Sequence, residues 1–361
     1  MGPSRLYDSK IPRWNSALNS YSFWNNKGGV GKSFLCFIAA NEYANRHPEN
    51  DVYVIDLCPQ ANVSETLLGG QRTSPKPMTE LLGRTPRCSV AGYLEERLNS
   101  PFRMIESVEE FVVSPSTYNK NIPKNLSLVC GDNLLELLSE PIRQASQMQL
   151  PQDAWAKVIN WIRDLCVALA ERSSPRDATF IIDCNPSFAI YTQLALAGSD
   201  SLVIPYTADD SSRRGIENVI ALLYGVGDST ISAYAKLSFG KKAREENVSI
   251  PKIHTLVSNR QTLYDGKPSK AFEAMSKTIK RTVDNIYKKK RSIFTYPSSI
   301  PSSEVVTIPD YHGASIVSAS IGIPLHRLKA GPHDVAGERV QINKDPLSRY
   351  KTALNLFVER L

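Results

Sequence analysis

The sequence of 361 residues lacks several features that define large classes of protein. No apolar run approaches the ~20 residues that a membrane-spanning helix needs, so we expect no stable membrane insertion. Residues 1–19 hold no apolar core of a secretory signal and are expected to form a short polar extension. The six cysteines include no Cys-x-x-Cys pair, which argues against a zinc ribbon or a paired-cysteine iron–sulfur site. Such scattered thiols indicate a reducing, cytoplasmic setting.

A large excess of charge of one sign is also missing. The formal net charge is +7 and the pI is near 9.0, which is compatible with a polyanionic partner but does not demonstrate one. Hydrophobic residues make up 42% of the chain, enough to bury one large α/β core with or without an additional lobe.

The most informative stretch is a glycine-rich string that begins at Lys27 and ends in Lys32 and Ser33. An apolar, aromatic run (21–24) precedes it, and an apolar segment with helical spacing (34–40) follows. This order of strand, glycine loop, Lys-Ser and helix is typical of a phosphate-binding loop. We expect Lys32 to reach the nucleotide phosphates and Ser33 to bind Mg²⁺. The residues expected to contact the nucleotide here are Gly28, Gly29, Val30, Gly31, Lys32, Ser33 and Phe34.

Two later apolar segments each end in a carboxylate. The segment 51–56 ends in Asp56, and the segment 179–183 ends in Asp183. The second arrangement is that of a Walker B strand, whose carboxylate engages Mg²⁺. Asp56 is expected to orient water or Mg²⁺, although an Asp there also suits the cap of the next helix.

Apolar strands alternate with helical patterns along residues 20–329. This alternation predicts an α/β fold with a doubly wound, mainly parallel sheet and helices on both faces. The stretch 65–150 is rich in loops and is expected to decorate that sheet. The tail 330–361 ends in an apolar stripe at helical spacing, for which packing against the body is favoured over membrane binding.

The string Lys-Gly-Gly-Val-Gly-Lys-Ser resembles the deviant Walker A motif of the ParA/MinD family of ATPases. The blocks that begin at Asp56 and Asp183 also resemble family blocks, in the expected order, and the likeness is greatest to ParA-type partition ATPases. The resemblance implies a homodimer that binds ATP and Mg²⁺, in which Lys27 reaches the partner's nucleotide. It further implies an adenine contact by Asn259, nucleoid DNA as a surface, and a ParB-like stimulating partner in plasmid or chromosome partition.

Two details refine that expectation. The chain holds no Asn-Lys-x-Asp guanine signature, so ATP is favoured over GTP. Where the family block usually has a second Asp, this chain has Cys58, and a thiol cannot accept a proton from water as a carboxylate does. Hydrolysis is therefore expected to be slow, to rest on Asp56, or to be lost. A dimerisation switch that does not hydrolyse ATP, and an ATPase that positions a protein cargo, remain open alternatives.

The densest basic run lies between residues 267 and 291. Several of its charges can share one face of a helix, where they would neutralise DNA phosphates without reading sequence. A solvated helix face is the alternative interpretation. The candidate DNA-binding residues are Lys277, Lys280, Arg281, Lys288, Lys289, Lys290 and Arg291.

Overall fold

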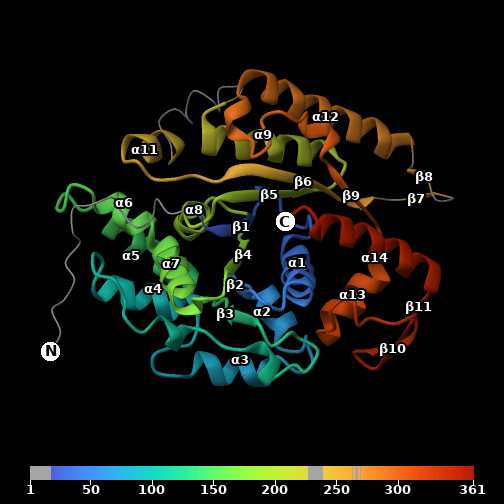
Figure 1. Cartoon of the computed structure of the whole chain (residues 1–361), viewed down its shortest axis with the longest axis horizontal. Helices are drawn as coiled ribbons and strands as arrows, with labels where there is room; N and C mark the ends of the chain where they lie inside the picture. Colours follow the sequence, from blue (N-terminus) through green and yellow to red (C-terminus); the bar gives the residue numbers. More distant parts are fainter. Residues whose placement is uncertain (1–17, 227–238, 262, 265–266, 269) are drawn as a thin grey trace.

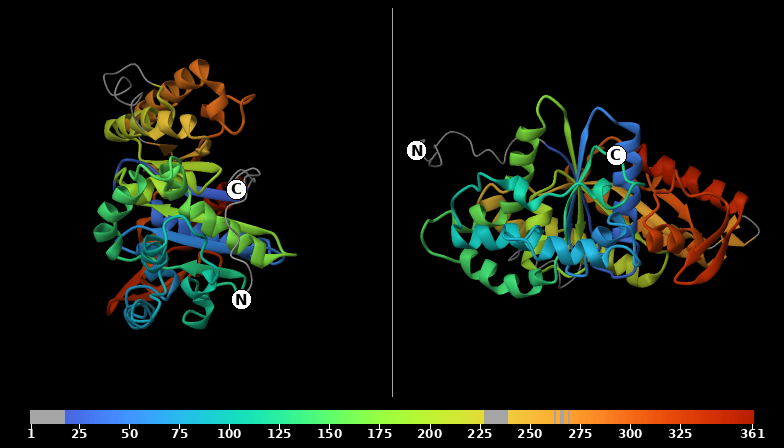
Figure 2. Two further views of the ribbon diagram at one scale, coloured as in Figure 1. Left: turned by 90° about the vertical axis from the view of Figure 1, so that its left-hand side faces the viewer. Right: turned by 90° about the horizontal axis from the view of Figure 1, so that it is seen from below.

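The computed structural model describes residues 18–361, apart from 227–238, 262, 265–266 and 269. Most of the extension expected over 1–19 therefore lies outside the described residues. Figures 1 and 2 show a central sheet with helices packed around it.

The sheet has seven strands in the order β3-β2-β4-β1-β5-β6-β9, and all of its strand pairs are parallel. The fold class predicted from the sequence is confirmed. The strands are β1 (Asn19–Phe23), β2 (Asp51–Leu57), β3 (Leu126–Val129), β4 (Ala178–Cys184), β5 (Ser201–Tyr206), β6 (Lys252–Gln261) and β9 (Val306–Pro309). Smaller antiparallel pairs are formed by β7 (Leu263–Tyr264) with β8 (Lys267–Pro268), and by β10 (Gly331–Val335) with β11 (Glu338–Ile342).

Strands buried on both faces explain the nearly continuous apolar runs in the sequence. In β2, Val52 and Val54 belong to one hydrophobic cluster, whereas Tyr53 and Ile55 belong to the other. Successive side chains of a strand point to opposite faces of the sheet, so each strand contributes side chains to both hydrophobic clusters. A parallel sheet needs helices over both faces to bury such strands.

The helices divide between these two faces. One face carries α1 (Lys32–Arg46), α2 (Asn62–Leu67), α3 (Pro75–Leu82), α13 (His312–Ile321) and α14 (Lys344–Val358). The other carries α4 (Val90–Asn99), α5 (Leu134–Ser146), α6 (Ala154–Ile159), α7 (Trp161–Ser173), α8 (Ile190–Ala197), α9 (Asp210–Tyr224), α11 (Phe239–Glu245) and α12 (Lys270–Lys289). Short 3-10 turns are η2 (Val108–Phe111), η3 (Pro115–Thr117), η4 (Arg291–Ile293) and η5 (Pro301–Ser303).

The C-terminal helix α14 packs against the body, as its apolar stripe led us to expect. Leu354 and Phe357 are fully buried, and the Phe357 ring meets Phe23 of β1 edge-on, with 6.1 Å between centroids. The hydroxyl of Tyr21 donates a hydrogen bond to the backbone carbonyl of Leu361. Figure 1 shows α14 lying beside α1 and β9. Among the described residues, no helix is both long and apolar enough to cross a membrane.

The carboxyl ends of the parallel strands meet at one edge of the sheet. The glycine loop follows β1 there, Asp56 and Asp183 lie at the ends of neighbouring strands, and Asn259 lies near the end of β6. Ligands of open α/β sheets bind outside this edge, because the loops and helix N-termini converge on it. The fold thus brings the sequence-predicted residues to one place.

Candidate nucleotide and magnesium site

The glycine loop has a backbone that only glycine adopts readily. Gly29 and Gly31 have φ values of +75° and +88°, in the left-handed region. A Cβ atom added to Gly31 would lie 2.3 Å from Nδ2 of Asn259, so the close approach also requires glycine. Lys32 is the first residue of α1, which places the N-terminal end of that helix beside the loop. Backbone N–H groups at such an end favour anions.

A cavity of about 330 Å³ opens beside this loop. Its wall is formed by Lys32 and Ser33 from the start of α1, by Cys58 and Gln60 after β2, and by Cys184 at the end of β4. Both the loop and the two carboxylate-bearing strands therefore border the same space. We refer to it below as the phosphate-side cavity.

A second cavity of about 160 Å³ lies on the other side of Gly31 and Phe34, which border both spaces. Asn259, Arg260 and Tyr311 contribute to its wall. We call it the base-side cavity, because Asn259, the residue expected to contact the adenine, lies in its wall. The two cavities share Gly31, Phe34, Arg260 and Ala319 as wall residues, and we refer to them together as the groove.

Lys32 is buried, and its ammonium group donates a hydrogen bond of 3.2 Å to the backbone carbonyl of Lys27. Burial lowers the pKa of Lys32, whereas the nearby Asp183 carboxylate raises it. The side chain therefore spans its own loop, with its charge close to the Asp183 carboxylate.

Asp183 is fully buried and holds an oxygen without a partner. Its Oδ2 atom accepts no hydrogen bond from the described residues, and Oδ1 accepts only a weak bond of 3.7 Å from the Cys36 thiol. Burial raises the pKa of Asp183, and the Ser33 hydroxyl and the Lys32 ammonium oppose that shift. Buried polar groups normally have partners, so this orphaned oxygen beside a serine hydroxyl fits a hard cation such as Mg²⁺.

Asp56 sits opposite Asp183 in the β2–β4 register, but its surroundings differ. Its Oδ1 atom accepts a bond of 3.0 Å from the Cys58 amide, and Oδ2 accepts bonds of 3.1 Å and 2.7 Å from the Ser64 amide and hydroxyl. The carboxylate is fully buried and, like that of Asp183, is not among the residues that line the two cavities described above. Both oxygens of Asp56 therefore hold the segment from the end of β2 to the start of α2, and its expected role toward water stays a prediction.

Cys58 replaces the usual second carboxylate with a neutral donor. Its thiol donates a weak bond of 3.7 Å to Oε1 of Gln60, an exposed side chain that borders the phosphate-side cavity. Burial raises the pKa of Cys58 to about 12, and the charges of Asp56 and Asp183 add to the shift. The thiol therefore stays protonated near neutral pH. The sequence analysis did not select Gln60 as a site residue, although its position two residues after Cys58 could have indicated that it lies near the cavity.

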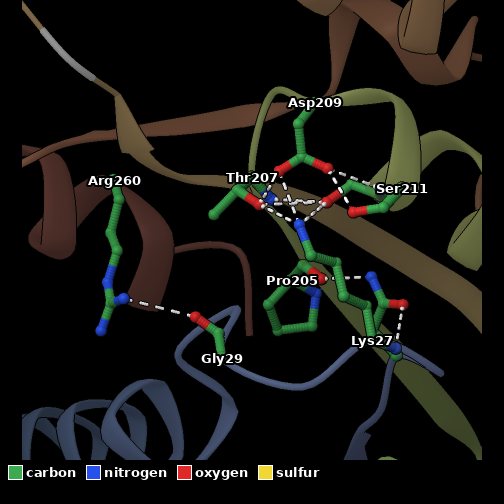
Figure 3. Close-up of polar contacts among 9 residues, drawn as sticks. Lys27, Gly29, Pro205, Thr207, Asp209, Ser211 and Arg260 are labelled. Carbon is green, nitrogen blue, oxygen red and sulfur yellow. Dashed lines mark hydrogen bonds and ion pairs between the residues drawn. The ribbon is translucent and has the colours of Figure 1, made fainter.

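Lys27 lies apart from the phosphate-side cavity. Its ammonium group donates to Asp209 Oδ2 at 2.6 Å, Thr207 Oγ1 at 3.0 Å and Ser212 Oγ at 3.2 Å (Figure 3). These partners lie after β5 and at the start of α9. Nothing in the local sequence around Lys27 indicates them, because they are some 180 residues away along the chain.

Asn259 supports the glycine loop. Its Nδ2 atom donates a bond of 2.9 Å to the Val30 carbonyl, and the side chain also borders the base-side cavity. The next residue, Arg260, has a left-handed backbone with φ +57° and donates to the Gly29 carbonyl at 3.3 Å (Figure 3). Arg260 borders both cavities, and the sequence analysis missed it.

The basic run lies on and after α12, on the face of the sheet opposite to α1 (Figure 1). Lys277, Arg281 and Lys288 are exposed, and their spacing places them along one side of the helix. Lys277 also forms an ion pair of 2.7 Å with Glu273. Lys280 is half-buried, and Lys289 is exposed.

The end of the basic run is less available than its sequence suggests. Lys290 is half-buried and donates a bond of 3.3 Å to the Tyr224 carbonyl at the end of α9. Arg291 lies over the Tyr287 ring, 5.2 Å from its centroid. The structure therefore leaves Lys277, Arg281, Lys288, Lys289 and Arg291 exposed, whereas Lys280 and Lys290 are half-buried.

No protein-family model matches the sequence, and no curated protein sequence matches it. Solved structures do resemble it. The apo form of McdA from Cyanothece covers 93% of this chain and 99% of its own length, with 16% identity and a TM-score of 0.57. An ATP complex of a Cyanothece McdA variant covers 95% of this chain and 97% of its own length, with 14% identity and a TM-score of 0.59.

A putative plasmid partition protein from Borrelia burgdorferi, bound to AMPPNP, is also similar. It covers 96% of this chain and 100% of its own length, with 18% identity and a TM-score of 0.52. At these identities the likeness shows the fold alone: the chain shares the α/β architecture of these structures over nearly its whole length.

Proposed function

We propose that the protein is a ParA-like ATPase that binds Mg-ATP in the groove across the glycine loop. The observation that carries the proposal is the meeting of Lys32 and Ser33 with the orphaned oxygen of Asp183 at one edge of the sheet. Similar structures that contain ATP or AMPPNP support the choice of ligand. Lys32 and the loop amides would hold phosphates, and Ser33 and Asp183 would hold Mg²⁺.

Magnesium, when bound, supplies positive charge that neutralises the phosphate oxygens. The residues of this chain do the rest. Lys32 would exchange its bond to the Lys27 carbonyl for phosphate oxygens, and Gly29 and Gly31 let the backbone approach them. Asn259 and Arg260 would face the base in the second cavity.

In the proposed cycle, two protomers dimerise around ATP, with Lys27 reaching the partner's nucleotide. The dimer binds DNA without sequence preference through the exposed basic residues of α12, and a ParB-like partner stimulates hydrolysis and release. The task would be plasmid or chromosome partition on the nucleoid, or the positioning of a protein cargo. The described fold and the resemblance of the glycine loop support this cycle.

A switch that binds ATP without hydrolysing it is the second candidate. The surroundings of Asp56 and the presence of Cys58 favour it. Asp56 uses both oxygens on its own loop, and Cys58 is a neutral thiol. Neither group is placed to take a proton from water. Gln60 is the remaining polar side chain next to Cys58, and an amide can orient water without accepting its proton.

ATP turnover of the purified protein, with and without DNA, separates these candidates. We expect slow turnover that disappears in Lys32→Ala and rises in Cys58→Asp, because the substitution restores a carboxylate beside the phosphate-side cavity. Wild-type protein that binds ATP without turnover, combined with an active Cys58→Asp variant, would select the switch. No ATP binding at all would refute both.

DNA binding is tested separately by salt dependence. The double variant Arg281→Ala/Lys288→Ala removes two exposed charges of α12, and Lys120→Ala/Lys124→Ala removes two exposed charges before β3, at the other end of the sheet. We expect the first pair to weaken binding to duplex DNA and to reduce the slope of affinity against salt by about 2. Equal effects of both pairs would exclude α12 as the contact surface.

A further inference from the structure

The contacts of Lys27 form a site of their own. The ammonium group has three N–H donors, and the structure gives each of them an acceptor: the Asp209 carboxylate and the hydroxyls of Thr207 and Ser212 (Figure 3). We call these three acceptors the Lys27 cage. The Lys27 side chain is 26% exposed and that of Asp209 is 44% exposed, so the ion pair lies partly in solvent.

The cage is held together independently of Lys27. The Thr207 hydroxyl donates to Asp209 Oδ2 at 2.6 Å, and the Ser212 amide donates to Asp209 Oδ1 at 2.9 Å. The second bond makes Asp209 the N-cap of α9. The Thr207 amide in turn donates to the Ser212 hydroxyl at 3.2 Å. The three acceptors therefore face Lys27 in a fixed arrangement set by the start of a helix.

The loop that carries Lys27 is tied to the same region. Asn25 accepts a bond of 3.0 Å from the Lys27 amide and donates one of 2.7 Å to the Pro205 carbonyl in β5. A Cβ atom added to Gly215 of α9 would lie 2.7 Å from Asn25 Oδ1, so this contact is close. Backbone and side chain together point Lys27 at Asp209.

An ammonium group with three occupied donors cannot bind a phosphate without leaving some of its partners. If Lys27 serves a nucleotide in a second copy of this chain, each protomer must first open its own cage. In this exchange the Lys27 ammonium leaves the singly charged Asp209 carboxylate and binds the more highly charged nucleotide phosphates. ATP carries more charge than ADP, so ATP competes better for Lys27.

We propose that Asp209 is a specificity-determining residue: it competes with the second protomer's nucleotide for Lys27 and so makes dimerisation depend on the γ-phosphate. This inference rests on the proposed function, in which Lys27 acts across a dimer. Thr207 and Ser212 are positioning residues that hold the two charges together. The cage keeps a nucleotide-free or ADP-bound protomer monomeric.

The test uses Asp209→Asn in the full chain. Asparagine is as good an N-cap as aspartate, so α9 keeps its cap while the cage loses its charge. The matched control is Asp210→Asn, because Asp210 pairs with Arg213 and Arg214 instead of Lys27. Thr207→Val is a second variant that loosens the cage without changing charge, should Asp209→Asn fail to fold.

Two measurements separate the cage from the proposed function. The first is acylation of Lys27 by an amine-reactive ester, followed by mass spectrometry on nucleotide-free protein. We expect labelling of Lys27 to be about fivefold faster in Asp209→Asn than in wild type or Asp210→Asn, a factor equal to the value of one partly exposed ion pair. Equal rates would show that the cage does not restrain Lys27.

The second measurement is the dimer dissociation constant, from light scattering at saturating ATP or ADP. Each dimer opens two cages, so we expect Asp209→Asn to dimerise about 25-fold more tightly with ATP, the square of the fivefold effect of one cage, and to dimerise measurably with ADP. A variant that dimerises like wild type, or more weakly, would overturn the competition. Wild-type protein that stays monomeric with ATP would refute the dimer of the proposed function, while the labelling rates would still decide on the cage.

Discussion

Asp56 and Asp183 are neighbours in the sheet with the same sequence signature and opposite surroundings. Each ends an apolar strand, and the two are paired in the β2–β4 register. Asp56 accepts bonds from Cys58 and Ser64 at both oxygens, whereas Asp183 leaves Oδ2 without a partner among the described residues. Three donors of the chain already engage Asp56, whereas Asp183 keeps an oxygen that the described residues leave unsatisfied, so Asp183 is the stronger candidate for a ligand.

The largest effect that separates the two carboxylates is expected from Asp183→Asn. The amide lacks the charge that Mg²⁺ requires, so affinity for Mg-ATP should fall by about 100-fold or more. The melting temperature should stay constant or rise, because the substitution removes a poorly satisfied buried carboxylate. Calorimetric titration and thermal unfolding measure the two quantities. A strongly destabilised variant would mean that Asp183 is structural.

Asp56→Asn should give the reverse pattern. The substitution leaves an amide nitrogen facing the Ser64 amide or the Cys58 amide, which are donors themselves. We expect a loss of about 2–3 kcal/mol in the free energy of unfolding, measured by urea denaturation. The folded variant should keep its affinity for Mg-ATP to within about threefold, since a shift of that size is under 1 kcal/mol. If fully folded Asp56→Asn bound Mg-ATP much more weakly than the wild type, Asp56 would be a residue of the binding site.

A smaller loss of stability is expected from Ser64→Ala. The Ser64 hydroxyl donates to Asp56 and accepts a bond of 2.8 Å from the Gly131 amide, so it joins the loop after β2 to the end of β3. Its removal leaves the Gly131 donor without that partner, at a cost of about 1–2 kcal/mol. Neither Ser212→Ala nor Ser211→Ala is a suitable control, because both hydroxyls bond to groups of the Lys27 cage. Ser348→Ala, at an exposed position of α14, serves instead. Equal denaturation midpoints of Ser64→Ala and Ser348→Ala would contradict the structural role given to Ser64 and Asp56.

The smallest stability effect is expected from Cys58→Asp, and its main readout is catalytic. A carboxylate at this position lies near Asp56 and Asp183, so like-charge repulsion should cost about 1 kcal/mol in stability at neutral pH. That loss should shrink as the pH falls, because protonation removes the repelling charge. Urea midpoints at two pH values, compared with wild type, measure it. A loss that grows on acidification would show that repulsion is not its cause.

The sequence was sufficient for the sheet, for the glycine loop and for the position of both carboxylates at its edge. Each of these rests on a local pattern: an apolar run, a glycine string or a strand-ending Asp. The sequence could not distinguish the roles of Asp56 and Asp183, because those depend on Ser64 and Gly131, which only the fold brings next to Asp56.

The same limit applies to the two lysines of the glycine loop. Lys32 could be placed from its motif, because the helix that follows it fixes its direction. The partners of Lys27 come from the segment after β5, and no local pattern relates Lys27 to Asp209. Likewise, the resemblance implied that Asn259 contacts the adenine base. Its bond to the Val30 carbonyl could not be predicted, because only the fold places β6 beside the glycine loop.

The most direct test of the central claim is calorimetric titration of Mg-ATP into the wild-type protein and into Lys32→Ala. Lys32 is buried beside Asp183 and borders the phosphate-side cavity at the start of α1, so its ammonium is placed to meet phosphates at the glycine loop. The account predicts that the wild type binds Mg-ATP and that Lys32→Ala loses about 100-fold in affinity, or nearly 3 kcal/mol, while remaining folded. Equal binding by both proteins, or no binding by the wild type, would contradict the assignment of this groove as a nucleotide site.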